Sequence, residues 1–258
     1  MTLADLDPER IRERLGTRRY GRSMEVLSVT GSTNEDARRA ADANAPDGHV
    51  VLADSQTRGR GSHGREWSSP AGDDLYFSIV DRPALSGAAL PPLTLAIGLA
   101  VAETVSALVR RRALVKWPND VWLDGRKCAG VLVEVSSSDA AIGPVVIGVG
   151  VNVNRRAWPE ELRGGAISLA EASGRALDRA SVLASFLDRI EARVDAYVSD
   201  GPTPMLRALA RRLALRGELV QCGDARGTLL GVAATGALRI ETERGVREIV
   251  SGTLERAP

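Results

Sequence analysis

Residues 54–67 read Asp-Ser-Gln-Thr-Arg-Gly-Arg-Gly-Ser-His-Gly-Arg-Glu-Trp, and this stretch, the arginine loop, interleaves three glycines with three arginines. Glycine lets the backbone approach a ligand closely and adopt positive φ. Arginine presents a planar fork of donors that matches carboxylate and phosphate groups. The pattern predicts a loop that wraps a small anion, and the alternative is a basic loop exposed to solvent.

The three glycines of the loop, Gly59, Gly61 and Gly64, also spell G-x-G-x-x-G, the dinucleotide-binding fingerprint. That fingerprint requires a helix directly after the last glycine, so that the helix N-terminus holds the pyrophosphate. Residues 66–72 read Glu-Trp-Ser-Ser-Pro-Ala-Gly, which favours no helix. An NAD-dependent oxidoreductase built on these glycines is therefore disfavoured.

The composition is that of an ordinary globular protein: 258 residues, 44% hydrophobic and 26% charged, with a net charge of +1. This neutral balance gives no argument for nucleic acid as a partner. The two cysteines, Cys128 and Cys222, are too few for a disulfide framework and predict reduced thiols in the cytoplasm. The charged N-terminus does not resemble a signal peptide, and no membrane span is expected.

Several local patterns predict elements of structure. Ser32-x-x-Glu35 has the form of a helix capping box. Asp124-Gly125 predicts a hairpin between two strands. An apolar stripe recurs every three or four residues between Pro91 and about Arg112, which predicts a long core helix.

The pattern changes near residue 214, where short β-like runs joined by glycine and aspartate turns begin. Five or fewer strands in about forty residues are typical of a small barrel. We therefore expect two domains, residues 1–213 and residues 214–258.

A second unusual stretch reads Lys116-Trp117-Pro118-Asn119-Asp120. Proline is tolerated in a strand only at an edge or a bulge, so a bulge here would re-aim the neighbouring polar side chains. Lys127 follows on the predicted hairpin arm beside the small residues Ala129 and Gly130, where it either reaches into a pocket or lies exposed. A third stretch, residues 148–154, is an apolar strand whose glycines allow a flat ring or another backbone to approach.

These stretches resemble, in order and spacing, the motifs of bacterial biotin–protein ligases, and the resemblance covers roughly residues 24–258. The matching residues are Ser32-Thr33-Asn34, Gln56, Gly59-Arg60-Gly61, Gly64-Arg65, Trp67, Ser69-Pro70, Lys116–Val121, Lys127, Ala129-Gly130 and Gly148–Asn152. The resemblance implies an α+β fold, with a mixed β-sheet flanked by helices as in class II synthetases and biotin–lipoate ligases, followed by a small SH3-like β-barrel. It also implies ATP-dependent activation of biotin to biotinyl-5′-AMP, with Mg²⁺, and transfer of biotin to one lysine of the biotin carboxyl carrier domain of an acyl-CoA carboxylase.

The resemblance also implies roles for individual residues. Lys127, Arg60, Lys116 and Asp120 are the expected catalytic residues, and Asp120 is an open choice between holding Mg²⁺, orienting Lys127 and receiving the incoming amine. Residues expected to bind biotin are Ser32, Thr33, Asn34, Gln56, Arg60, Gly61, Ser62, Lys127 and Gly130. Residues expected to bind ATP are Arg65, Trp67, Lys116, Asn119 and Asn152.

Two features depart from the family pattern. Ser62 stands where arginine is usual and Arg58 where a small residue is usual, so we predict that Arg58 partly replaces the missing guanidinium. Only about 30 residues precede Ser32, which is too short for a winged helix-turn-helix, so a short form without a DNA-binding domain is expected.

Three alternatives remain open from the sequence. A lipoate or octanoate ligase would share the catalytic fold, although the Lys-Trp-Pro-Asn-Asp run and the C-terminal β-domain favour biotin. The C-terminal domain by itself suggests a nucleic-acid or protein-binding module, against which the neutral charge argues. A homodimer through sheet edges is plausible from the resemblance but has no direct support in the sequence.

Overall fold

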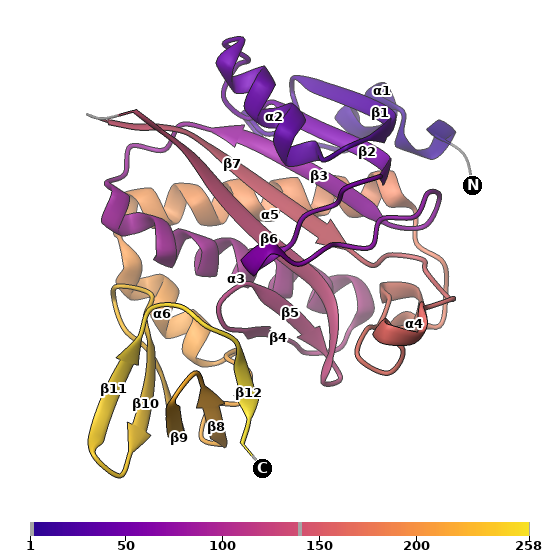
Figure 1. Cartoon of the computed structure of the whole chain (residues 1–258). Coiled ribbons are helices and arrows are strands. Elements are labelled where there is room, and N and C mark those ends of the chain that lie inside the picture. Colours follow the sequence, from indigo (N-terminus) through magenta and orange to yellow (C-terminus); the bar gives the residue numbers. More distant parts are fainter. Residues whose placement is uncertain (1–2, 139–140, 258) are drawn as a thin grey trace.

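The central element of the computed structural model, which describes residues 3–138 and 141–257, is a seven-stranded mixed β-sheet (Figure 1). Its strand order is β1-β2-β3-β7-β6-β5-β4, and β1 and β2 pair in parallel while the other neighbours are antiparallel. The strands are β1 (Met24–Thr30), β2 (Val50–Gln56), β3 (Leu75–Asp81), β4 (Ala113–Lys116), β5 (Asp120–Leu123), β6 (Arg126–Ser138) and β7 (Ala141–Val151). A mixed sheet flanked by helices confirms this part of the predicted fold class.

Helices cover both faces of this sheet, with α3 and α5 on one face and α2 on the other (Figure 1). The helices are α1 (Pro8–Arg12), α2 (Thr33–Asp42), α3 (Leu90–Val109), α4 (Leu169–Ser173), α5 (Arg179–Asp200) and α6 (Pro202–Ala210). Short 3-10 turns occur at Leu3–Leu6, Ser62–Gly64, Gly87–Ala89 and Glu160–Leu162.

The strand sequences explain the two-sided cover. Successive side chains of a strand point to opposite faces, so a strand buried on both faces reads as a continuous apolar run. In β2, Val50 and Leu52 join the large core beneath α3 and α5, whereas Val51 joins a smaller cluster with Ala37 and Ala41 of α2. The apolar run at residues 50–53 of β2 therefore reflects the burial of this strand on both faces of the sheet.

The long helix α3 meets the prediction of a buried apolar stripe. The segment Gly87–Val109 is long and apolar enough to cross a membrane by length and hydropathy, with a mean hydropathy of 1.8, although no such segment was expected. However, 72% of the apolar 18-residue stretch within this segment is buried inside the fold, where α3 packs against the sheet and α5.

Two local predictions had opposite outcomes. The Asp124-Gly125 hairpin is confirmed, with positive φ at both residues (51° and 75°), as a type I′ turn requires. The capping box at Ser32 is wrong: Ser32 is the N-cap of α2, but its side chain makes no capping hydrogen bond. Glu35 instead lies 3.3 Å from the guanidinium of Arg58, so this ion pair takes the carboxylate that the box would need.

The predicted bulge at Pro118 is also wrong. Strand β4 ends at Lys116 and β5 begins at Asp120, so Pro118 lies in the short turn between two antiparallel strands. The polar side chains are nevertheless re-aimed, as expected, because this turn directs Asn119 and Asp120 toward β6.

The C-terminal strands form a separate five-stranded sheet with the order β11-β10-β9-β8-β12 (Figure 1). They are β8 (Leu219–Cys222), β9 (Ala225–Val232), β10 (Leu238–Thr242), β11 (Gly245–Ile249) and β12 (Leu254–Arg256). Within the described residues β11 and β12 remain unpaired edges, so the sheet is open and the predicted closed barrel is not confirmed. Trp117 Nε1 donates a 2.9 Å hydrogen bond to the Gly236 carbonyl, which ties this sheet to the larger one.

Candidate active site

Two adjoining cavities lie beside the arginine loop, and Trp67 and Lys127 line both of them. The first cavity is lined by Ser32, Thr33, Asn34, Gln56, Arg60, Gly61, Ser62, Trp67, Tyr76, Asn119, Lys127, Gly130, Val131, Leu132, Gly148, Val149 and Gly150. The second is lined by Glu66, Trp67, Ser68, Lys127, Asn152, Arg155, Trp158, Glu161, Leu162, Gly165 and Ala166. The chain therefore offers two neighbouring binding sites with a common wall.

The first cavity has a polar end built by the start of α2 and the end of β2. Gln56 Oε1 accepts from the Thr33 amide at 2.9 Å, and Gln56 Nε2 donates to Ser69 Oγ at 2.9 Å. Ser78 Oγ lies 2.8 Å from Thr33 Oγ1 and 2.6 Å from Asn34 Oδ1. Such a connected set of amides and hydroxyls holds each side chain in one orientation, as recognition of a polar ring requires.

A pair of glycines forms the seat of Trp67 between the cavities. A Cβ on Gly150 would lie 2.4 Å from Trp67 Cε2, and one on Gly130 would lie 2.9 Å from Trp67 Cζ3. The indole therefore lies against backbone that only glycine permits, so of the two predicted possibilities, a flat ring or another backbone, a flat ring approaches β7 at Gly150. Trp67 Nε1 is buried and has no hydrogen-bond partner among the described residues.

Lys127 provides the positive charge at the common wall. Its Nζ lies 2.7 Å from Asp120 Oδ1 and 5.0 Å from the centre of the Trp67 ring. The carboxylate contact is an ion pair rather than a directed hydrogen bond. The Lys127 amide donates to the Gly165 carbonyl at 2.9 Å, and this bond anchors the strand to the far wall of the second cavity.

The arginine loop folds back on itself over the first cavity. The Trp67 amide donates to the Gly59 carbonyl at 2.9 Å, and the Gly61 amide donates to the Arg65 carbonyl at 2.7 Å. The loop contains the 3-10 turn at Ser62–Gly64 and then continues to β3, and no helix follows Gly64 in this described stretch. The dinucleotide-binding interpretation is therefore excluded for these glycines.

The arginines of the loop have different positions. Arg60 lines the first cavity, where its Nη2 lies 2.9 Å from Glu134 Oε1. Arg58 is 73% exposed and pairs with Glu35 outside both linings, so the structure gives no support to the prediction that it replaces the guanidinium absent at Ser62. Arg65 also lies outside both linings, and its Nε donates to the Ser62 carbonyl at 3.4 Å.

The remaining predicted residues are near the common wall but not all within it. Asn119 lines the first cavity, and its Nδ2 is engaged by the Val131 carbonyl at 3.0 Å. Asn152 lines the second cavity and donates through Nδ2 to the carbonyls of Lys127 and Ile167. Lys116 lies outside both linings with its Nζ 4.9 Å from the Trp122 ring centre, and burial lowers the pKa of its ammonium.

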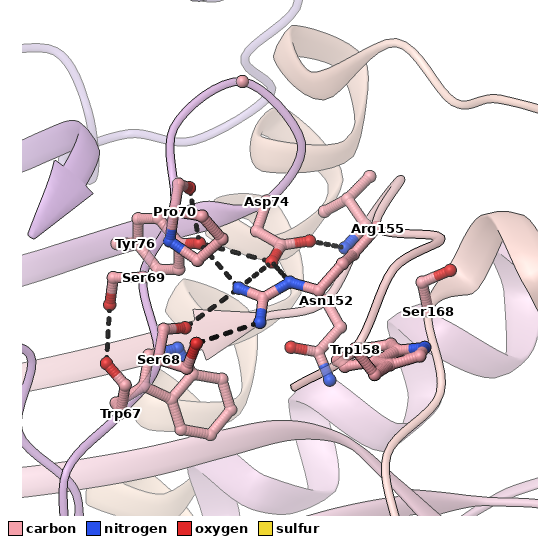
Figure 2. Close-up of polar contacts among 12 residues, drawn as sticks. Trp67, Ser68, Ser69, Pro70, Asp74, Tyr76, Asn152, Arg155, Trp158 and Ser168 are labelled. Atoms are coloured by element: carbon pink, nitrogen blue, oxygen red, sulfur yellow. Dashed lines mark hydrogen bonds and ion pairs between the residues drawn. The ribbon is translucent and has the colours of Figure 1, made fainter. Parts of the chain in front are cut away.

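Polar and aromatic lining residues that were not predicted from the sequence include Tyr76, Arg155 and Trp158, and Glu134, which pairs with Arg60, was not predicted either. Arg155 and Trp158 line the second cavity, and Figure 2 shows the Arg155 guanidinium among Asp74, Tyr76 and Ser68. Their signal in the sequence was weak, although Trp158 is one of only four tryptophans and follows a pair of arginines.

The donor set does not form a resident metal site. Among the described residues, no three His, Cys, Asp or Glu side chains converge on one point. Asp120 lies 2.7 Å from the ammonium of Lys127, which already neutralises it. Burial raises the pKa of the Cys128 thiol to about 12, so this cysteine is a packed apolar side chain and not a nucleophile.

Comparison with known proteins gives one consistent family. The family model described as "Biotin/lipoate A/B protein ligase family" matches residues 24–152. The Bifunctional ligase/repressor BirA of Bacillus spizizenii is 35% identical over 97% of this chain and 79% of its own length. The Biotin--[acetyl-CoA-carboxylase] ligase of Mycobacterium tuberculosis is 37% identical over 81% of this chain and 79% of its own length.

A solved structure agrees with the sequence relatives. The biotin protein ligase from Aquifex aeolicus in complex with biotin and ATP superposes with a TM-score of 0.82 at 34% identity. The match covers 92% of this chain and all of the Aquifex chain. By family model, close relatives and fold together, this chain belongs to the biotin/lipoate A/B protein ligase family.

Proposed function

We propose that this protein is an ATP-dependent biotin–protein ligase that forms biotinyl-5′-AMP and transfers biotin to a lysine of a biotin carboxyl carrier domain. The observation that carries the proposal is the pair of cavities with Lys127 and Trp67 in their common wall. The names of its relatives support it, since they include biotin–[acetyl-CoA-carboxylase] ligases and a ligase bound to biotin and ATP.

Biotin is assigned to the first cavity. Thr33, Gln56 and Ser32 surround its polar end and match the hydrogen-bonding groups of the ureido ring. Gly130 and Gly148 line the same cavity, and a side chain at either position would displace Trp67 or Asn34 from its wall. The valerate chain then extends toward the common wall, where Arg60 and Lys127 receive its carboxylate.

ATP is assigned to the second cavity, with the adenine between the aromatic side chains of Trp67 and Trp158. Asn152 uses Nδ2 for two backbone carbonyls, so its Oδ1 accepts from the adenine amino group in this proposal. Lys116 and Arg65, which lie outside both linings, are assigned to the charged phosphate tail. Mg²⁺ enters with ATP as part of the substrate and supplies further neutralisation of the phosphates.

The first reaction brings two anions together. A carboxylate oxygen of biotin attacks the α-phosphorus of ATP, the bond from that phosphorus to the β-phosphate bridging oxygen breaks, and pyrophosphate leaves. Repulsion between two unit charges ~4 Å apart is about 1 kcal/mol in water and about 4 kcal/mol at the effective dielectric of a partly buried site. Lys127 and Arg60 offset this repulsion, while the two cavities hold the reactants in line.

The second reaction transfers the acyl group. The Nε of the carrier lysine attacks the acyl carbon, AMP leaves with the electron pair of the broken acyl–oxygen bond, and the proton lost by the amine passes to water. We assign Asp120 to the orientation of Lys127, because their charged atoms are 2.7 Å apart. No nucleophilic side chain is needed, which agrees with the burial of Cys128.

The proposal extends to organisation. The C-terminal sheet is assigned as an SH3-like domain that begins near residue 214, supported by its separate strand order and its own turns. A cytoplasmic location is supported by two buried free cysteines, and the exposed edge strand β1 leaves room for a homodimer. In this proposal the protein binds a biotin carboxyl carrier domain and has no DNA or membrane partner.

The test mixes the protein with ATP, Mg²⁺ and a biotin carboxyl carrier domain, and compares biotin with lipoate. We expect a mass increase on the carrier lysine with biotin and none with lipoate. A carrier that is modified with lipoate but not with biotin would assign the protein to the other branch of its family. A carrier modified with neither would contradict the proposal.

A further inference from the structure

Arg155 is a buried cation whose contacts reach both cavities (Figure 2). It lies just after β7 and is only 3% exposed. Its Nε donates to Asp74 Oδ2 at 2.7 Å, and the side chain of Asp74 is fully buried. Asp74 Oδ1 in turn accepts from the Val153 amide at 2.8 Å, so the carboxylate joins β3 to the end of β7.

One side of the Arg155 fork holds the stem of the arginine loop. Nη2 donates to the Ser68 carbonyl at 2.9 Å, and Nη1 donates to Ser68 Oγ at 3.2 Å. Nη2 also donates to the hydroxyl of Tyr76 at 3.2 Å, and that hydroxyl donates to the Pro70 carbonyl at 3.0 Å. Ser68 directly follows Trp67 in the common wall, and Tyr76 lines the first cavity.

The face of the same guanidinium supports the second cavity. Its Cζ lies 5.1 Å from the centre of the Trp158 ring, within the range of a cation–π contact. Trp158 Nε1 lies 3.3 Å from Glu171 Oε2, so the indole is held from two sides. Figure 2 shows Trp158 and Trp67 on either side of Asn152, with the guanidinium of Arg155 above them.

Stability alone does not account for an arginine at this place. The cost of removing two charges from water offsets most of the attraction in a buried ion pair, so such a pair is a weak source of stability. What arginine adds is geometry, because a planar fork can bond two partners and stack on a ring at the same time. A lysine ammonium retains the charge opposite Asp74 but has no fork for Ser68 and Tyr76.

We propose that Arg155 is a positioning residue for both substrates: through Ser68 it fixes the loop stem beside the first cavity, and through Trp158 it fixes the aromatic wall of the second. This inference rests on the proposed function, since biotin and ATP are the ligands assigned to the two cavities. It adds a physical link between them, carried by one side chain that touches neither reacting atom.

The test uses Arg155→Lys, with Arg193→Lys as the matched control, because Arg193 pairs with Glu103 between α5 and α3 outside both cavities. Melting temperature, the Kd for biotin and the Kd for a non-hydrolysable ATP analogue are measured for each protein. We expect both affinities of Arg155→Lys to fall about tenfold, the effect of losing one charge-assisted hydrogen bond. Arg193→Lys is expected to bind both ligands as the wild type does.

A second variant separates the two sides of the link. Trp158→Ala is expected to weaken binding of the ATP analogue and to leave the Kd for biotin unchanged. In the double variant with Arg155→Lys, the losses for the analogue should be less than additive, since both changes disturb the same wall. Additive losses for the analogue would overturn the stacking part of the inference.

Three results would overturn the proposal for Arg155. Arg155→Lys with a lowered melting temperature but wild-type affinity for both ligands would leave only a structural ion pair, and loss of one affinity alone would remove the link. If Arg155→Lys does not fold, the neutral pair Asp74→Asn with Arg155→Gln is expected to show the same two losses, and wild-type affinities there would overturn it. A wild-type protein that binds neither ligand would instead contradict the proposed function.

Discussion

Lys127 places its ammonium in the wall between two cavities, 2.7 Å from Asp120 and 5.0 Å from the centre of the Trp67 ring. Its role in the proposal follows from charge and position, because the first reaction requires no protein nucleophile. Arg60 is the second cation of the first cavity, and Glu134 holds its guanidinium at 2.9 Å. The carboxylate of biotin must therefore compete with Glu134 for Arg60, whereas Lys127 already faces both cavities.

Replacement of Lys127 by methionine preserves most of the side-chain volume and removes the charge. We expect biotin-dependent pyrophosphate release to fall roughly 10²–10³-fold, the usual effect of losing one group that stabilises developing charge. The control is Arg126→Met, which changes the preceding residue of β6 outside both cavity linings. Stopped-flow measurement of pyrophosphate and a melting curve for each variant check the result, and undiminished release from Lys127→Met would remove the assignment.

Ser62 lines the first cavity at a position where the resemblance leads one to expect arginine. We expect Ser62→Arg to slow the release of biotinyl-5′-AMP by about tenfold, because a guanidinium adds a charge-assisted hydrogen bond to the phosphate. Arg58→Ala should release the adenylate at the wild-type rate, since Arg58 is 73% exposed and pairs with Glu35. Faster release from Arg58→Ala would restore the earlier prediction that this arginine compensates for Ser62.

Strands β6 and β7 contribute to the site through their lack of side chains at Gly130 and Gly150. The Trp67 indole occupies the space that two Cβ atoms would take, so these glycines set the position of the common wall. The loop that carries Trp67 is held at its stem by one backbone hydrogen bond to Gly59 and by Arg155. The position of the Trp67 ring is therefore set both by β6 and β7, against which it packs, and by the anchored stem of its own loop.

Gly150→Ala tests this arrangement. A Cβ at Gly150 would lie 2.4 Å from Trp67 Cε2, so the indole must move, and we expect affinity for both biotin and ATP to fall at least about tenfold. Gly98→Ala in α3 is the matched control: its Cβ would meet only Val115 at 3.6 Å, and alanine favours a helix by about 0.5–1 kcal/mol. Isothermal titration of each variant with both ligands would contradict the account if Gly150→Ala bound like the control.

Features of these elements that depend on residues close in the sequence were predicted correctly, whereas contacts between residues far apart in the sequence were not. The strands were predictable because apolar runs and the Asp124-Gly125 turn depend on neighbouring residues. The capping box was predicted wrongly, because the residue that engages Glu35 is Arg58, 23 residues further along the chain. Arg155 was missed for the same reason, since its buried partner Asp74 lies 81 residues away in the chain.

The C-terminal sheet and the larger sheet meet at the motif that also supplies site residues. Trp117 is 2% exposed and bonds to Gly236, and its neighbours Lys116, Asn119 and Asp120 lie at or near the common wall. The change in sequence pattern near residue 214 predicts a separate C-terminal β-domain, and the structure has a second sheet there. The contact between Trp117 and Gly236 could not be predicted, because the sequence does not indicate which carbonyl an indole will reach.

Trp117→Phe retains an aromatic ring and removes this hydrogen bond. The Gly236 carbonyl then loses its buried donor, and we expect the free energy of unfolding to fall by about 1–3 kcal/mol. Trp122→Phe, a change in the next strand, is the control, because its indole faces Lys116 rather than the second sheet. Urea denaturation of both variants measures the difference, and equal stability of Trp117→Phe and wild type would show that the contact carries no weight.

The central claim is that a carboxylate in one cavity and a phosphate in the other meet at Lys127. A crystal structure with a non-hydrolysable biotinyl-5′-AMP analogue tests it most directly. We predict the biotin rings beside Thr33 and Gln56, the adenine beside Trp158, and an acyl-phosphate oxygen about 2.7–3.2 Å from Lys127 Nζ. An analogue bound with Lys127 turned away from the acyl phosphate, or bound outside the two cavities, would contradict the account.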